Sequence, residues 1–127
     1  MKNKVLKVKY YNWNGLKEEK EWIIYDDMSV DFSIESYLTN AEKKSTTLLL
    51  NKSEYEEIFN EINISRQNET FIAGNDGNGW SFTEYKNNIV VWKMDPGYID
   101  SNEPLKNITN ILQSKSREFE IKASLND

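Results

Sequence analysis

Five residues of types that bind cations or sugars lie between positions 76 and 100 at one end of a predicted hairpin, where they could form one rim. They are three aspartates and two aromatic residues, namely Asp76, Trp80, Asp95, Tyr98 and Asp100. Carboxylate oxygens are ligands for hard cations, and a few polar groups beside aromatic rings can line a pocket for a small molecule. The other interpretation is that the aspartates bond to amides of their own turns while the tryptophan fills the core. We favour this second interpretation.

A second group of carboxylates, Asp26, Asp27, Asp31 and Glu35, could supply a pair for acid and base chemistry, as in glycosidases. Strict alternation places Asp31 and Glu35 on the outer face of one strand. A solvated face lacks the burial that separates the pKa values of two carboxylates. We therefore expect these carboxylates to be solvated charges, and the chain is more readily interpreted as a binding protein than as an enzyme.

The 127 residues include no cysteine and no histidine. This excludes disulfides, thiol nucleophiles, serine–histidine dyads and zinc sites built on these side chains. The residues 75–78 do not match the order of ligands in an EF-hand calcium loop. We expect no metal and no cofactor.

The formal net charge is −5, and the basic residues are scattered among acidic ones. An acidic surface repels phosphate backbones, so nucleic acid is not expected as a partner. No stretch approaches the roughly 20 apolar residues of a membrane span. Lys7 and Lys9 interrupt any apolar run of the kind that a signal peptide needs, which favours a cytoplasmic protein.

An acidic helix is predicted from Glu54 to Asn63. Ser53 and Glu56 have the spacing of a capping box, in which each side chain bonds to the backbone amide of the other residue. Apolar residues follow at helical spacing, at Tyr55, Ile58, Phe59 and Ile62. The acidic residues Glu54, Glu56, Glu57 and Glu61 could face a basic partner such as a nuclease toxin. The other interpretation, which we favour for these residues, is an ordinary solvated face.

Three strands are predicted before this helix. Asn14-Gly15 is a strong hairpin signal and should join a strand over Lys4–Tyr11 to one over Glu21–Tyr25. The segment Val30–Glu35 alternates between apolar and polar residues and predicts a third strand. The apolar segment Thr46–Leu50 is expected to form either a short strand or a lead-in to the helix.

A glycine-rich turn precedes a second predicted hairpin. Three of the five glycines lie within 74–79, where they permit a sharp turn. Short strands are expected at Thr70–Ala73, Trp80–Tyr85 and Ile89–Met94, followed by a turn at Asp95-Pro96-Gly97. A three-residue loop at 86–88 is predicted because it sets Trp80 opposite Met94 and Phe82 opposite Trp92, on one apolar face.

A second helix is predicted from Pro104, which suits a first turn. Its end is left open, because Phe119 fits both a continued helix and a short strand. The order of elements favours one α+β domain over residues 1–127. We expect an antiparallel sheet of about six to seven strands with two helices on one face.

A run of residues with a helix on either side resembles a pattern in a group of small, uncharacterised bacterial proteins; it consists of Gly74, Asp76-Gly77, Trp80, Glu84, Trp92 and Pro96. Some of these resemble immunity proteins of polymorphic toxin systems. The resemblance extends over about residues 46–115 and implies a protein partner.

The leading hypothesis is a non-enzymatic, protein-binding module of the immunity or inhibitor type, with a basic partner. Its candidate binding residues are Glu54, Glu57, Glu61, Asp76, Asp95, Tyr98 and Asp100. One alternative is a small carboxylate-based hydrolase or carbohydrate-binding domain that uses the residues between Asp76 and Asp100. Another is a structural protein that forms homo-oligomers.

Overall fold

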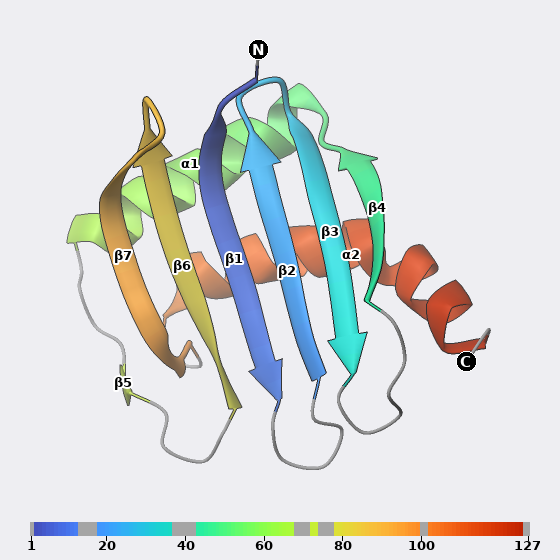
Figure 1. Cartoon of the computed structure of the whole chain (residues 1–127). Helices are drawn as coiled ribbons and strands as arrows, with labels where there is room; N and C mark the ends of the chain where they lie inside the picture. The colour runs from blue at the N-terminus through green and yellow to red at the C-terminus, as the bar shows by residue number, and fades with distance from the viewer. Residues whose placement is uncertain are drawn as a thin grey trace.

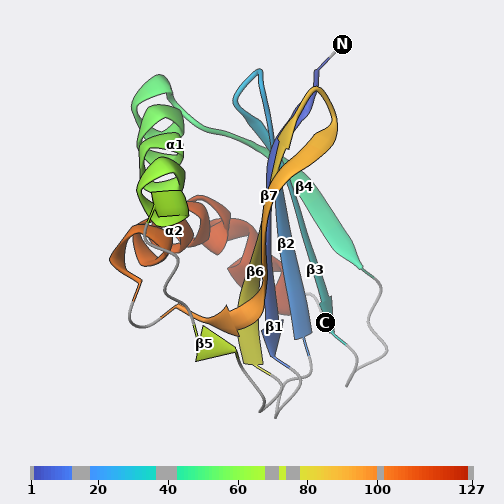
Figure 2. The same ribbon diagram turned by 90° about the vertical axis from the view of Figure 1, so that its left-hand side faces the viewer.

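Seven strands form one antiparallel sheet in the order β4-β3-β2-β1-β6-β7-β5, and two helices pack on one of its faces (Figures 1 and 2). This is a computed structural model, which describes residues 2–12, 18–36, 43–67, 72–73, 78–99 and 102–125. The strands are β1 (Lys4–Asn12), β2 (Glu18–Tyr25), β3 (Ser29–Ser36), β4 (Lys44–Leu49), β5 (Ile72–Ala73), β6 (Asn78–Lys86) and β7 (Ile89–Tyr98). The helices are α1 (Lys52–Gln67) and α2 (Glu103–Leu125). The predicted α+β class and layer arrangement are confirmed.

The first three strands all alternate between the two faces, as was predicted for the third. One set of side chains is fully buried against the helices: Leu6, Val8, Trp22, Ile24, Val30 and Phe32. The residues between them point to the other side of the sheet. β2 begins at Glu18, three residues before the predicted start, and pairs there with Asn12. The predicted turn at Asn14-Gly15 lies outside the described residues.

The hairpin between β6 and β7 corrects the predicted three-residue loop. Its turn has two residues, Asn87 and Asn88, which both have positive φ, at 52° and 63°. Lys86 therefore pairs with Ile89. Positive φ at both central positions is the geometry that matches the twist of the two strands, and asparagine tolerates it better than most residues.

A bulge at Val91 then shifts the register of this hairpin. Val91 has no partner on β6, because its two neighbours pair with consecutive residues of β6. Phe82 consequently lies opposite Met94, and both are buried. Trp80 and Trp92 lie on the same face, half-buried against the core. The predicted apolar face is therefore correct, but it is produced by a tight turn with a bulge and not by a longer loop.

The predicted turn at Asp95-Pro96-Gly97 is wrong, because β7 continues through it to Tyr98. A second register shift lies here, where two residues of β7 oppose one of β6. Proline lacks the N–H that a sheet ladder needs, and a bulge is a place where a strand tolerates it. Gly79 packs closely on this segment: a Cβ on Gly79 would lie 3.2 Å from both the N and the O of Gly97.

Helix α1 starts two residues earlier than predicted, and its capping box is a different pair. The Glu54 amide donates to Asn51 Oδ1 at 2.8 Å, and the Asn51 amide donates to Glu54 Oε1 at 2.9 Å. Asn51 is as good a cap as serine and stands directly after β4. Ser53 therefore lies inside the first turn. Ile58 and Ile62 are buried as the predicted apolar face requires.

Helix α2 extends beyond the segment that the sequence most clearly predicts to be helical. Asn102 caps it by accepting the Leu105 amide at 3.0 Å. The helix then continues past Phe119, whose ring meets that of Phe32 edge-on with centroids 5.9 Å apart. The helical interpretation of Phe119 is thus confirmed over the strand.

Both helices lie on the same side of the sheet, so no helix of the described residues lies over the opposite side (Figure 2). We call this uncovered side the open face. The core lies between the sheet and the helices, where the side chains of β1, β2, β3 and β6 meet those of α1 and α2. No helix in the described part of the chain is long and apolar enough to cross a membrane.

Candidate functional site

The acidic residues predicted on α1 are largely engaged in contacts within the chain. Glu54 forms an ion pair with Lys115 of α2 at 2.8 Å. Glu61 accepts a hydrogen bond from Asn107, also on α2, at 3.0 Å. Glu57 is exposed. The carboxylates thus hold the two helices together, and Glu57 alone of the three candidate residues projects into solvent.

The other predicted binding residues cannot be joined into one site from the described part of the chain. Asp76 and Asp100 lie outside the described residues. Asp95 and Tyr98 belong to β7, but only their backbone is described. β6 begins and β7 ends at the same end of the sheet, as the sequence predicts (Figure 1).

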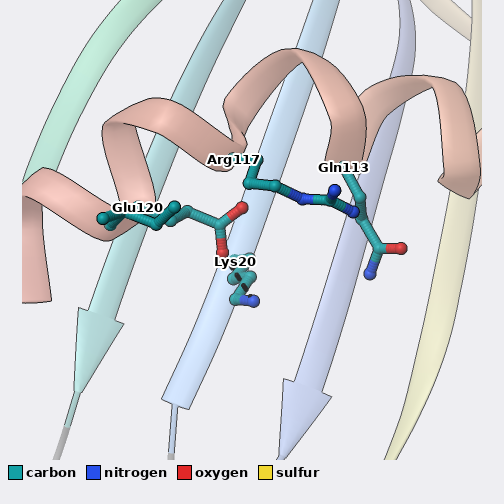
Figure 3. A pocket seen from close by; sticks show the side chains of 5 residues that line it. Lys20, Gln113, Arg117 and Glu120 are labelled. Atoms are coloured by element: carbon teal, nitrogen blue, oxygen red, sulfur yellow. Dashed lines mark ion pairs between the residues drawn. The ribbon is translucent and has the colours of Figure 1, made fainter.

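A cleft of about 390 Å³ separates α2 from β2 near the end of the sheet (Figure 3). Lys20 on β2 faces Glu120 on α2, with 2.6 Å between Nζ and Oε1. Gln113 and Arg117 lie along the same side of the helix. This arrangement was not predicted, because it joins residues about 100 positions apart.

The facing charges of Lys20 and Glu120 neutralise each other and are held in place. Burial lowers the pKa of Lys20, but the hydrogen bond and charge of Glu120 and the nearby Glu18 outweigh it and raise that pKa. Glu120 also accepts a hydrogen bond from Ser116 at 2.9 Å, and Ser116 accepts one from the buried Trp22 ring at 3.2 Å. A lysine with a raised pKa stays protonated and is a poor base or nucleophile. The cleft therefore favours a structural ion pair over catalysis.

Glu84, which lies in the glycine- and tryptophan-rich part of the sequence, is a buried carboxylate on the helix-covered face. Its Oε2 accepts a hydrogen bond from Arg66 of α1 at 2.9 Å. Asn63 accepts a second bond from the same guanidinium nitrogen at 2.8 Å. Glu84 Oε1 and Arg66 Nε are buried and have no hydrogen-bond partner among the described residues. The pair attaches α1 to the sheet.

Strand β7 presents an unpaired apolar edge. β5 pairs with it only at Gly97 and Tyr98, so no described strand covers the part from Ile89 to Lys93. Three consecutive aliphatic residues there are exposed, with 67% of Ile89, 51% of Val90 and 47% of Val91 accessible. An edge strand with exposed apolar residues is a template for pairing with another chain.

A hollow of about 470 Å³ lies on the open face over β2, β3 and β4. Asp31 is one of its lining residues and accepts hydrogen bonds from Tyr25 at 2.9 Å and from Thr47 at 3.2 Å. Burial, together with the hydrogen bond to Asp31, raises the pKa of the Tyr25 hydroxyl. Glu35 shares this face, as predicted. The hydrogen bonds of Asp31 go to hydroxyl groups, which does not match a paired-carboxylate catalytic site.

No group of three or more acidic residues in the described ranges could hold a metal ion. Sequence reasoning missed the cleft beside α2 and the unpaired edge of β7. The edge had a signal, since Ile89-Val90-Val91 is a run of aliphatic residues without alternation. Whether a strand lies at an edge depends on strand order, which a single sequence does not reveal.

The chain was compared with protein-family models and with curated proteins, and neither comparison finds a match.

Proposed function

We propose that this chain is a non-enzymatic protein-binding module, of the immunity or inhibitor type, that binds an extended segment of its partner along the β7 edge. The observation that carries the proposal is the exposed run Ile89-Val90-Val91 on a part of β7 that no described strand covers. Added strands gain affinity from main-chain hydrogen bonds and specificity from alternate side chains.

An exposed aliphatic run at this position is unusual for an edge strand. Proteins commonly protect edge strands with proline, with charged residues or with a covering segment. In β7 the proline and the short β5 lie at the far end, near Gly97. The part next to the turn keeps its aliphatic residues exposed, which supports a use for them.

The charges around the run indicate the kind of segment that would fit. Lys86 and Lys93 are both exposed and stand on either side of it. A partner segment with aliphatic residues at its centre and acidic residues at its ends would complement them. The expectation of a basic partner was based on the carboxylates of α1. Two of them, Glu54 and Glu61, contact α2.

The proposal is tested by capture of proteins from a lysate of the source cells with three immobilised forms of the chain. Val91→Lys places a charge on the β7 edge, and we expect it to abolish capture of the wild-type partner. Leu49→Lys is the matched control, because Leu49 is 70% exposed on β4 at the opposite edge of the sheet. We expect it to capture the partner normally.

Amide hydrogen exchange of the complex then locates the contact. Slower exchange of the amides between Ile89 and Lys93 on binding is the expected result. A partner that binds Val91→Lys as well as wild type, or that leaves these amides unprotected, would refute binding at this edge. If binding instead weakens in Glu57→Gln and at high salt, the partner is a basic protein that docks on α1.

A further inference from the structure

The charges on the open face are divided between its two halves. On β1 and β7 the charged side chains described there are all basic, at Lys4, Lys7, Lys9 and Lys93. On β2 and β3 they are all acidic, at Glu19, Glu21, Asp31 and Glu35. These positions follow from the register, because each pairs with an open-face residue and alternates with the buried side chains. The two halves meet where Lys9 and Glu21 form an ion pair at 3.7 Å.

The boundary between the halves is also the midline of the sheet. Without the two-residue β5, the order is β4-β3-β2 on one side and β1-β6-β7 on the other. A twofold axis parallel to the strands at this midline would place β1 of one copy over β2 of the other. Every basic strand would then face an acidic or neutral one.

We propose that the open face binds the open face of a second copy of this chain, in a weak homodimer with such a twofold axis. A twofold contact must be complementary to itself, and a face with one basic and one acidic half meets this condition. Two sheets that pack face to face keep their strands roughly aligned, which the axis also requires.

The shape of the face agrees with this pairing. The hollow on the acidic half lies over β3 and β4, and among its lining residues Lys43 is the one cation. Under the twofold axis this hollow faces β6 and β7 of the second copy. Lys93 is exposed there and can project toward Asp31. The β7 edge stays free, so the dimer is compatible with the proposed partner site.

The size of the face sets the expected strength. The six strands are 6 to 10 residues long, and with about 3.3 Å per residue and about 4.8 Å between strands they give roughly 700 Å² per copy. Stable complexes bury about 800 Å² per partner. We therefore expect a weak dimer whose dissociation constant rises at least tenfold with salt, since the contacts are between charged groups near water.

Sedimentation of the full chain over a range of concentrations tests the dimer, at about 0.01 M and about 1 M salt, where the Debye length falls from about 30 Å to about 3 Å. We expect dimers at low salt and their loss at high salt. A first variant, Lys7→Glu with Lys9→Glu, places acidic side chains on both strands at the midline, β1 and β2. A second, Glu19→Lys with Glu21→Lys, places basic side chains on both of these strands. Each alone should be monomeric.

A mixture of these two variants gives the decisive result. The axis places the reversed strand of one variant against the oppositely charged strand of the other, so the mixture should form heterodimers at low salt. The control is Lys52→Glu with Lys122→Glu. It makes the same change in net charge as the first variant, but on the exposed faces of α1 and α2. It should dimerise as wild type does. Circular dichroism checks that every variant is folded.

Two results would overturn the proposal. One is a wild-type chain that stays monomeric at every concentration at low salt. The other is a mixture of the two folded variants that fails to associate. If wild type dimerises but Val91→Lys is monomeric and both charge variants still dimerise, the contact is the β7 edge and not the open face. These outcomes are independent of whether the β7 edge captures a different protein.

Discussion

The two faces of the sheet are built from the same strands but solve different physical problems. On the covered face the central apolar side chains, such as Val8 and Phe32, are fully buried, and charged groups such as Glu84 and Lys20 have a partner on a helix. On the open face the described charged side chains are partly or fully accessible, and they are divided by strand. Burial makes an unpaired charge costly, whereas a solvated charge is free to serve recognition.

The largest test of this contrast uses two neighbours on β3 that point to opposite faces. Phe32 is fully buried between Trp22 and Phe119, so Phe32→Ala should lower the free energy of unfolding by about 3–5 kcal/mol. Asp31→Ala removes two hydrogen bonds at a partly accessible site and should cost about 1 kcal/mol. Urea denaturation measures both. Equal losses would show that the two faces do not differ as described.

The buried pair of Glu84 and Arg66 gives the next test. Arg66→Leu leaves Glu84 buried without its charge partner and should cost about 2–4 kcal/mol, less than for a fully buried pair because a third of Arg66 is accessible. Replacing both residues by leucine should recover at least half of that loss, since no buried charge remains. If the double variant is less stable than Arg66→Leu, the Glu84–Arg66 pair stabilises the fold by more than its attachment of α1 to the sheet.

The smallest effect concerns the capping box of α1 and its dependence on pH. Burial raises the pKa of Glu54, but its hydrogen bond with the Asn51 amide and the ion pair with Lys115 outweigh this and lower the pKa below the ordinary 4.5. The stabilisation is therefore present above the ordinary value and is lost as the pH falls through the lowered one.

Glu54→Gln should accordingly cost about 0.5–1 kcal/mol near neutral pH, and the difference from wild type should shrink below about pH 4. Thermal unfolding of both proteins across that range measures the change. Glu57→Gln is the control, because Glu57 is exposed and should show a difference near zero at each pH. A constant difference for Glu54→Gln would mean that charge plays no part in the cap.

Several sequence predictions failed at one kind of place, where two local signals competed. Ser53 and Asn51 each form a capping pattern with a glutamate three residues on, and the position of β4 selects Asn51. The register of the β6–β7 hairpin was argued from its apolar face alone. A bulge at Val91 produces the same apolar face with a shorter, two-residue turn. Pro96 indicated a turn, yet a second bulge accommodates it within β7.

The sequence by itself determined the elements of this protein and the apolar side of each one. Alternation and helical spacing are local, and they record which side chains must leave water. The tertiary structure decided what strand order controls: that Glu54 and Glu61 contact α2, that Ile89–Val91 lie on an edge, and that basic and acidic strands occupy separate halves of one face. Charges that are mixed along the chain are sorted by strand order, because neighbours in a sheet need not be neighbours in sequence.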